Sequence, residues 1–272
     1  MRSLIFALAI AISLVSCQKN AVTGRSQLLL VDEGELQKLS LQQYDEFLSK
    51  NKVVPKGSSR EQERVARVGQ RLAAAIAEYY ASQGKGEVTK DYKWEFNLVD
   101  NKDANAWCMP GGKVVVYTGL LPIAKTDAEL AVVMGHEITH ALAKHGNERM
   151  SEAMIQQLGG EALSVVMISK PAATRDIFLQ AYGVGTTLGG TLPFGRKQEL
   201  EADRYGLIIA AVAGYDPREA IAFWQSMAKA NEGKQAPEWL STHPSDASRI
   251  ERVKAYSQEA MKYYKPANQS LK

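Results

Sequence analysis

The chain has 272 residues, of which 45% are hydrophobic and 23% charged, so it is long and apolar enough to bury a substantial core. Its 33 Lys and Arg residues against 30 Asp and Glu residues leave a formal charge of +3, and no run of like charges is long enough to bind nucleic acid. Composition therefore predicts a globular protein without a nucleic-acid partner.

The N-terminus looks like a secretory leader. Arg2 precedes an apolar stretch over residues 4–15, too short to span a bilayer, and Leu14-Val15-Ser16-Cys17 follows without an Ala-x-Ala cleavage site. That ending resembles the bacterial lipobox, in which the Cys is acylated, although a plain signal peptide or a membrane helix are alternatives. We expect residues 1–16 to be a lipoprotein signal peptide and Cys17 to anchor the chain in a membrane of the bacterial cell envelope. Gln18 favours the outer membrane, with the chain facing the periplasm.

Three further segments complete the predicted organisation. Residues 17–58 read as a polar tether and a first helix, closed by Gly57-Ser58-Ser59; residues 59–264 form the main domain, and residues 265–272 a C-terminal tail. With only two cysteines, one of them lipidated, Cys108 has no intramolecular partner, so packing must stabilise the fold.

Strands precede helices in the main domain. Residues 60–82 carry apolar side chains at helical spacing and predict an amphipathic helix. Residues 92–99 alternate apolar with polar, and residues 113–118 are a β-branched run after Pro110-Gly111-Gly112, so both predict strands that could pair. The remainder after Gly119 is mostly helical. The order predicts an α+β fold that is mainly helical with a small sheet.

The best-marked helix lies over residues 126–146. Thr126 and Glu129 form a capping box, Asp127 adds negative charge to the first turn, and Gly146 is expected to end the helix. A second helix is expected over residues 196–213. A third begins at Asp216-Pro217 and continues over residues 220–230.

The first of these helices contains Gly135-His136-Glu137-Ile138-Thr139-His140, the His-Glu-x-x-His pattern of zinc hydrolases. Residues four apart on a helix share a face, so His136 and His140 can bind one metal ion. Glu137 lies about 60° from His140 and can reach a water on the metal without binding the metal. The alternative is two ordinary histidines on an amphipathic helix.

A catalytic zinc site needs a third protein ligand. His145 is one candidate, but it lies about 140° around the helix from His140 and should face elsewhere. The longer metzincin signature also fails, because Ala143 and Gly146 stand where that pattern needs Gly and His.

A better candidate lies on the helix over residues 196–213. Glu199 and Asp203 are four apart and share a face, so Glu199 can bind zinc while Asp203 accepts a hydrogen bond from a liganding histidine. Glu201 lies about 200° from Glu199 and should point away. The alternative is an exposed acidic helix face.

With these motifs, the chain resembles the HtpX-like and Oma-like family of gluzincin zinc metallopeptidases over about residues 21–256. The resemblance implies a zincin-type domain, one zinc per chain, Glu199 as third ligand and Asp203 as its supporting acid. It also implies that the strand over residues 114–117 is the sheet edge that faces the active-site cleft and pairs with an extended substrate. Besides the two helical motifs it is carried by residues 22–28, Asn105-Ala106, residues 112–121, and Thr242-His243-Pro244 with Arg249-Ile250.

The resemblance also assigns roles to His243 and Arg249. Both are expected over the zinc, with His243 near the oxyanion and Arg249 supporting the site. In some members the equivalent histidine can instead occupy the open position on the zinc. Without the resemblance, His243 would be a loop residue and Arg249 a helix-surface residue.

The resulting prediction is a zinc-dependent endopeptidase of the bacterial cell envelope that cleaves unfolded or misassembled proteins. Glu137, Asp203, His243 and Arg249 are the predicted catalytic residues, and His136, His140 and Glu199 the zinc ligands. The alternative is an envelope assembly factor or chaperone whose zinc site is regulatory or structural. The sequence predicts no particular oligomeric state.

Overall fold

The centre of the molecule is a three-stranded sheet in the order β3-β5-β4. The computed structural model describes residues 17–158, 171–182, 195–232, 237, 239–243 and 248–266, so the predicted signal peptide and most of the predicted tail lie outside the described residues. Strand β3 (Glu95–Val99) runs parallel to β5 (Lys113–Tyr117), and β4 (Ala106–Met109) runs antiparallel to it. The predicted pairing of residues 92–99 with residues 113–118 is therefore confirmed.

The position of β5 corrects one prediction. Residues 114–117 were expected at the edge of the sheet, but β5 is paired on both sides, and β4 lies at the edge instead. Strand β4 is only four residues long and carries no polar alternation, so its sequence gave no strand signal. It turns into β5 through Gly111 and Gly112, whose φ values of 78° and 85° favour glycine.

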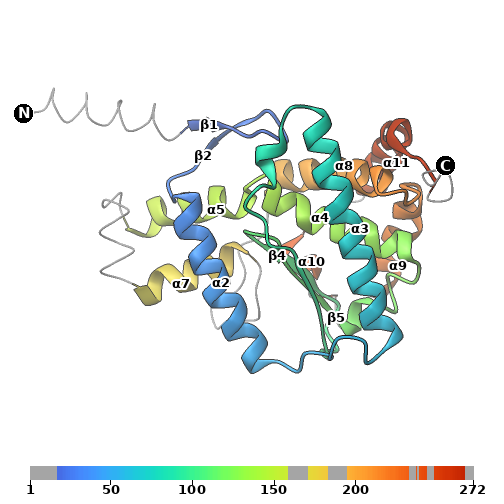
Figure 1. Cartoon of the computed structure of the whole chain (residues 1–272), viewed down its shortest axis with the longest axis horizontal. Coiled ribbons are helices and arrows are strands. Elements are labelled where there is room, and N and C mark those ends of the chain that lie inside the picture. The colour runs from blue at the N-terminus through green and yellow to red at the C-terminus, as the bar shows by residue number, and fades with distance from the viewer. Residues whose placement is uncertain are drawn as a thin grey trace, which may run out of the picture.

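Helices cover both faces of this sheet (Figure 1). Val114 and Val116 of β5 pack into one core, and Val115 and Tyr117 pack into the other, because successive side chains of a strand point to opposite faces. The first core is shared with α3 (Arg60–Ser82), α4 (Asp127–Leu142), α8 (Arg196–Val212), α9 (Glu219–Asn231) and α11 (Arg249–Ala260). The second is shared with α2 (Glu33–Lys50), α5 (His145–Leu158) and α7 (Pro171–Ala181).

Helix α4 begins at the predicted position and ends earlier than predicted. The side chain of Thr126 accepts from the Glu129 N–H and the Glu129 side chain accepts from the Thr126 N–H, which completes the capping box. The helix ends at Leu142 rather than at Gly146, because Lys144 takes a left-handed φ of 56° and turns the chain into α5. Lys144 is held there by an ion pair of 2.6 Å with Glu33 of α2.

The segment predicted as a tether is an ordered hairpin in its first part. Strand β1 (Cys17–Lys19) pairs antiparallel with β2 (Ser26–Leu28), and the Asn20 side chain accepts from the backbone N–H groups of Val22 and Thr23 in the turn. Val22 is buried in the core of α3 and α4. Local side-chain hydrogen bonds and this buried Val fix a segment whose polar composition suggested a free linker.

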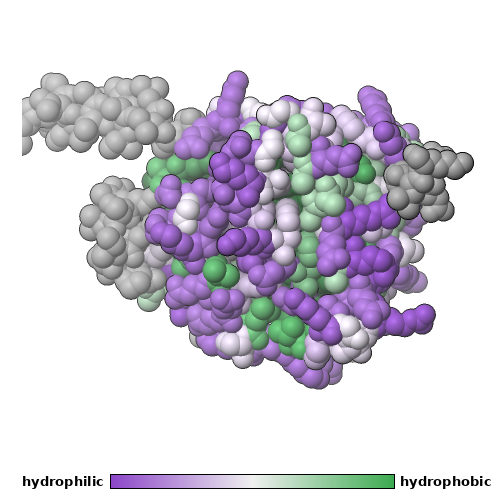
Figure 2. Space-filling view, viewed as in Figure 1, coloured by the Kyte–Doolittle hydropathy of each residue, from purple (hydrophilic) through white to green (hydrophobic). Residues whose placement is uncertain are grey.

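The outer surface is mainly hydrophilic on the face drawn in Figure 2, with small hydrophobic areas between charged residues. In the part of the chain that is described, no helix combines the length and the apolar character needed to cross a bilayer.

Candidate metal centre

Two helices that touch at their backbones carry the site. Gly135 of α4 and Gly206 of α8 lie at the crossing, and a methyl group built on Gly135 would lie 2.8 Å from the Gly206 carbonyl oxygen. Because neither residue has a side chain, α8 comes close enough for Glu199 and Asp203 to reach the imidazoles of α4.

Four buried side chains place one donor atom each in a small cluster: His136, His140, Glu199 and His243, with these atoms within 4.8 Å of one another. The Nε2 atoms of His136 and His140 are 3.1 Å apart, and Glu199 Oε1 lies 3.3 Å from His140 Nε2. His243 Nδ1 lies 3.2 Å from His136 Nε2. Donors bound tetrahedrally at zinc distances are roughly 3.3 Å apart, so these residues fit a zinc ion.

The protonation of this cluster also fits a metal. Burial lowers the pKa of His140 well below its usual value and lowers the pKa of His243, which favours the neutral imidazoles that bind metals. Burial alone would raise the pKa of Glu199, but His243 and His136 hold it well below its usual value. His140 and His243 therefore offer neutral nitrogen donors, and Glu199 offers a carboxylate.

Glu137 lies beside the cluster and is engaged by a tryptophan. The indole Nε1 of Trp239, in the short helix α10 (Trp239–Thr242), donates to Glu137 Oε1 at 2.5 Å. The Trp239 ring also stacks on the His243 ring, with centroids 4.7 Å apart. Burial raises the pKa of Glu137 to about 7. A carboxylate with such a pKa can both accept and return a proton near neutral pH.

Asp203 orients one histidine and is itself held by Arg249. His136 Nδ1 lies 3.0 Å from Asp203 Oδ1, and Arg249 donates to both carboxylate oxygens at 2.9 and 3.0 Å. Arg249 is 2% exposed and its guanidinium lies over the Trp224 ring, 3.7 Å from the centroid. Arg249 also forms an ion pair of 2.9 Å with Glu199 Oε2. The structure therefore brings all seven predicted site residues together.

His145 and Glu201 were expected to face away from the metal ligands; neither belongs to the donor cluster, but the two contact each other, and His145 contacts the rear of His140. His145 Nδ1 lies 2.9 Å from His140 Nδ1, and His145 Nε2 lies 2.9 Å from Glu201 Oε2. The angular argument assumed one continuous helix, whereas the turn at Lys144 directs His145 back toward His140. Trp239 was also missed, although it lies four residues before His243, a spacing that places two side chains on one helical face.

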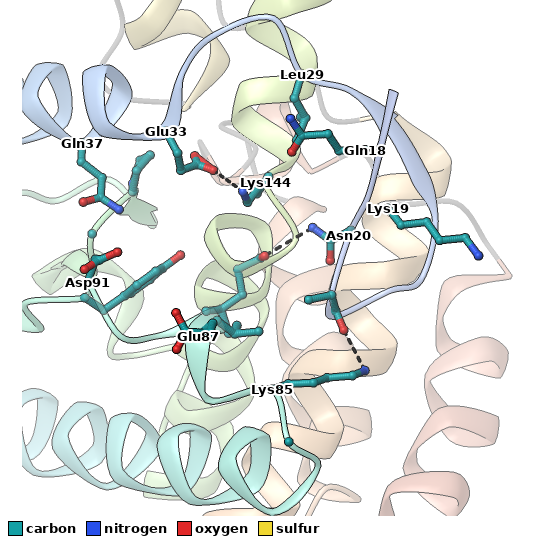
Figure 3. A pocket seen from close by; sticks show the side chains of 17 residues that line it. Gln18, Lys19, Asn20, Leu29, Glu33, Gln37, Lys85, Glu87, Asp91 and Lys144 are labelled. Atoms are coloured by element: carbon teal, nitrogen blue, oxygen red, sulfur yellow. Dashed lines mark hydrogen bonds and ion pairs between the residues drawn. The ribbon is translucent and has the colours of Figure 1, made fainter. Parts of the chain in front are cut away.

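The cluster is closed to bulk solvent in the described part of the chain. The side chains of His136, Glu137 and His140 are each 3% exposed. The adjoining cavity, lined by His136, Asp203 and Trp239 among others, measures about 10 Å³ and holds at most one water. A pocket of about 360 Å³ lies elsewhere, between the N-terminal hairpin and the turn after α4 (Figure 3).

A His-Glu-x-x-His helix, a carboxylate from a second helix and a neighbouring sheet edge define a gluzincin-type metallopeptidase site. Comparison with known proteins agrees, since residues 59–257 match the model of peptidase family M48. The chain belongs to this family of metallopeptidases.

Relatives in the family include mitochondrial metalloendopeptidases. The chain is 39% identical over 156 residues to "Mitochondrial metalloendopeptidase OMA1" of Arabidopsis thaliana, covering 57% of this chain and 30% of the relative. It is 31% identical over 258 residues to the bovine "Metalloendopeptidase OMA1, mitochondrial", covering 91% and 47%. It is 30% identical over 165 residues to the "Beta-barrel assembly-enhancing protease" of Escherichia coli, covering 58% and 33%. The chain thus spans about half or less of the length of these relatives.

These relatives contradict the predicted location. Metalloendopeptidases from plant, yeasts and mammals, at 29–39% identity, carry names that place them in mitochondria, which does not agree with a bacterial outer-membrane lipoprotein. The prediction rested on a short apolar segment before a cysteine, and hydrophobicity of this kind indicates a leader without specifying its target membrane. The assignment to the bacterial cell envelope, with its outer membrane and periplasm, is therefore not retained, and acylation of Cys17 is untested.

Proposed function

We propose that the chain is a zinc-dependent endopeptidase that hydrolyses internal peptide bonds of unfolded or misassembled proteins. The observation that supports it most is the tetrahedral spacing of donors from His136, His140 and Glu199 beside the buried carboxylate of Glu137. A role in protein quality control agrees with the names of the relatives, which are metalloendopeptidases and an assembly-enhancing protease.

In the proposed reaction, His136, His140 and Glu199 hold one zinc ion. Zinc bound there supplies a Lewis acid that polarises the scissile carbonyl and makes water a nucleophile near neutral pH. Glu137 takes the proton from the attacking water and returns it to the leaving amine, for which a pKa near neutrality is suited. Asp203 holds the His136 ring through Nδ1, and Arg249 fixes Asp203.

Substrate reaches Glu137 only when the segment with Trp239 and His243 moves. The indole N–H of Trp239 donates to Glu137 Oε1. His243 Nδ1 is the fourth donor of the cluster, beside those of His136, His140 and Glu199. The backbone N–H of Trp239 donates to the carbonyl of Ala104 at 3.1 Å, and Ala104 lies just before the edge strand β4. An extended substrate that pairs with β4 would need the same region. The described conformation therefore corresponds to a closed enzyme, in which His243 stands in the site and Arg249 holds Asp203.

The test compares zinc content and cleavage of an unfolded protein by the chain without residues 1–16, by Glu137→Gln and by Glu152→Gln. Glu152 is exposed on α5 and serves as the matched control. We expect about one zinc per chain in all three and loss of cleavage in Glu137→Gln alone. Cleavage by Glu137→Gln at the parent rate would refute the proposed role of Glu137.

The closed site favours a second candidate, an assembly factor in which zinc is regulatory or structural. It predicts that Glu137→Gln preserves the biological function while abolishing cleavage. A complementation assay in a strain that lacks the gene distinguishes the two, because the endopeptidase proposal requires the variant to fail.

A further inference from the structure

Two of the three histidines of the candidate centre, His136 and His140, are each supported from behind by contacts that lead to an acid and an arginine. His136 contacts Asp203, which Arg249 holds. His140 contacts His145 through its Nδ1 atom, at 2.9 Å. His145 in turn contacts Glu201, so an imidazole is inserted between the ligand and its acid.

The arginine behind His140 comes from the N-terminal hairpin. Arg25 donates to Glu201 from Nε at 2.8 Å and from Nη2 at 3.1 Å. The same guanidinium donates to both oxygens of Glu148 on α5, at 2.5 and 2.7 Å. These planar, paired contacts fix the Glu201 carboxylate in both position and angle.

The hydrogen bonds from His140 to His145 and from His145 to Glu201 run in one direction, with each group donating to the next. His140 Nε2 faces His136 and Glu199, so a metal-binding His140 carries its proton on Nδ1 and donates it to His145 Nδ1. His145 then carries its proton on Nε2 and donates it to the Glu201 carboxylate. His145 is 0% exposed, so water does not compete for these bonds.

The hairpin also holds the backbone beyond His140. Gln27 Nε2 donates to the Ala143 carbonyl at 2.8 Å, and Asn20 Nδ2 donates to the Leu142 carbonyl at 3.5 Å. Figure 3 shows the Asn20 contact at the border of a pocket of about 360 Å³ between the hairpin and the end of α4. The polar contacts of the hairpin therefore help to set its position against α4, together with the buried Val22.

We propose that Arg25, Glu201 and His145 are positioning residues for His140, so that the N-terminal hairpin is part of the metal centre. The proposal rests on the proposed function, because it requires His140 to bind the metal. Arg25 lies outside residues 59–257, which match the family model. A chain of those residues alone would therefore lack the contacts of Arg25 with Glu201. The expected ligand is a divalent transition metal of the zinc type.

The test measures metal binding directly. Zinc affinity is determined by chelator competition for the chain without residues 1–16 and for His145→Phe, Glu201→Gln and Arg25→Gln, and the visible absorption of the cobalt(II)-substituted proteins is compared. Each variant should bind zinc about 10- to 100-fold more weakly and should change the cobalt spectrum, since groups behind metal ligands contribute in this range. Glu201→Gln keeps the side-chain shape and carries the test if His145→Phe does not fold.

Two comparisons separate positioning from general stability. Arg64→Gln removes a half-buried arginine that donates to Asp127 and to the Ala124 carbonyl at the opposite end of α4, and it should leave zinc affinity and the cobalt spectrum unchanged. The double variant Arg25→Gln with Glu201→Gln should lose no more affinity than the weaker-binding single variant, because both act through one row of contacts. Arg25→Lys should restore part of the loss.

Parent-like zinc affinity and cobalt spectra in all three variants would overturn the positioning role, even if their melting temperatures fall. Absence of zinc binding by the parent chain would overturn the proposed function together with this inference. Zinc binding and cleavage by the parent with unaffected variants would overturn this inference alone.

Discussion

Gly135 and Gly206 meet backbone to backbone where α4 crosses α8. A Cβ atom on Gly206 would lie 2.8 Å from the His136 backbone nitrogen, closer than real Cβ contacts allow. The spacing of the two helices, and with it the reach of Glu199 to the imidazoles of α4, therefore depends on the absence of a side chain at both positions.

Gly206→Ala should push the helices apart and weaken zinc binding. Overpacking of this kind costs about 1–3 kcal/mol, against about 1 kcal/mol gained from the better helix propensity of Ala. Zinc affinity from chelator competition and the melting temperature should both fall. Gly86→Ala is the control, because a Cβ at Gly86 meets nothing within 4 Å. Unchanged zinc affinity in Gly206→Ala would show that the helix spacing does not limit the site.

Asp203→Asn should weaken zinc binding and destabilise the fold. The substitution removes one of the two carboxylates that pair with Arg249, which is 2% exposed, and breaking a buried ion pair costs about 3–5 kcal/mol. Thermal unfolding and zinc titration measure the two effects. Asp100→Asn breaks an ion pair with Lys52, which is 81% exposed, and should leave both quantities nearly unchanged. Equal losses in both variants would contradict the structural role of Asp203.

His243→Ala should increase cleavage of an unfolded protein. Removing the imidazole vacates the position near the fourth vertex and the stacking partner of Trp239, so the open fraction of molecules rises. The initial rate scales with that fraction, and an increase of up to about tenfold is expected. Trp239→Phe, which keeps a ring but loses the donor to Glu137, should act in the same direction. A fall in the rate of His243→Ala would instead assign His243 to the reaction itself.

Acid should loosen the attachment of the hairpin through Glu148. Burial alone would raise the pKa of Glu148, but hydrogen bonds from Arg25 and Gln198 lower it below the usual value. A carboxyl whose pKa is depressed in the folded state stabilises it above the unfolded pKa of about 4.3, and that stability is lost as the pH falls through the folded value. The melting temperature should therefore drop below about pH 4.3, and this drop should be smaller in Glu148→Gln.

Circular dichroism melts between pH 3 and pH 7 measure this dependence. Glu46→Gln is the control, since Glu46 pairs with Lys50 on the surface and contributes little to stability. An acid-induced drop that is the same in Glu148→Gln and in the parent would exclude Glu148 as its source.

The residues of the candidate metal centre could be predicted because their spacing is local. His136 and His140 are four apart on one helix, Glu199 and Asp203 are four apart on another, and each pair shares a face whatever the rest of the fold does. The capping box at Thr126 fixed the start of α4 for the same reason.

The features that could not be predicted depend on contacts between residues far apart in the sequence or on a single backbone angle. Glu137 and Trp239 are 102 residues apart, and no local pattern links them. The contact of His145 with His140 was missed because one left-handed residue, Lys144, interrupts the helix. The edge strand β4 could not be recognised because it is buried on both faces and therefore lacks alternation.

The turn at Lys144 also constrains the length of the chain between His140 and His145. Each residue inserted or deleted there would rotate the following side chains by about 100° on a helix, so His145 would lose His140 even if every residue type were kept. Substitutions within the turn are a different matter, because Asn20 and Gln27 contact main-chain carbonyls, which any amino acid supplies. The contacts of the hairpin with this stretch are therefore more sensitive to insertion and deletion than to a change of side chain, while position 144 must accept a left-handed φ.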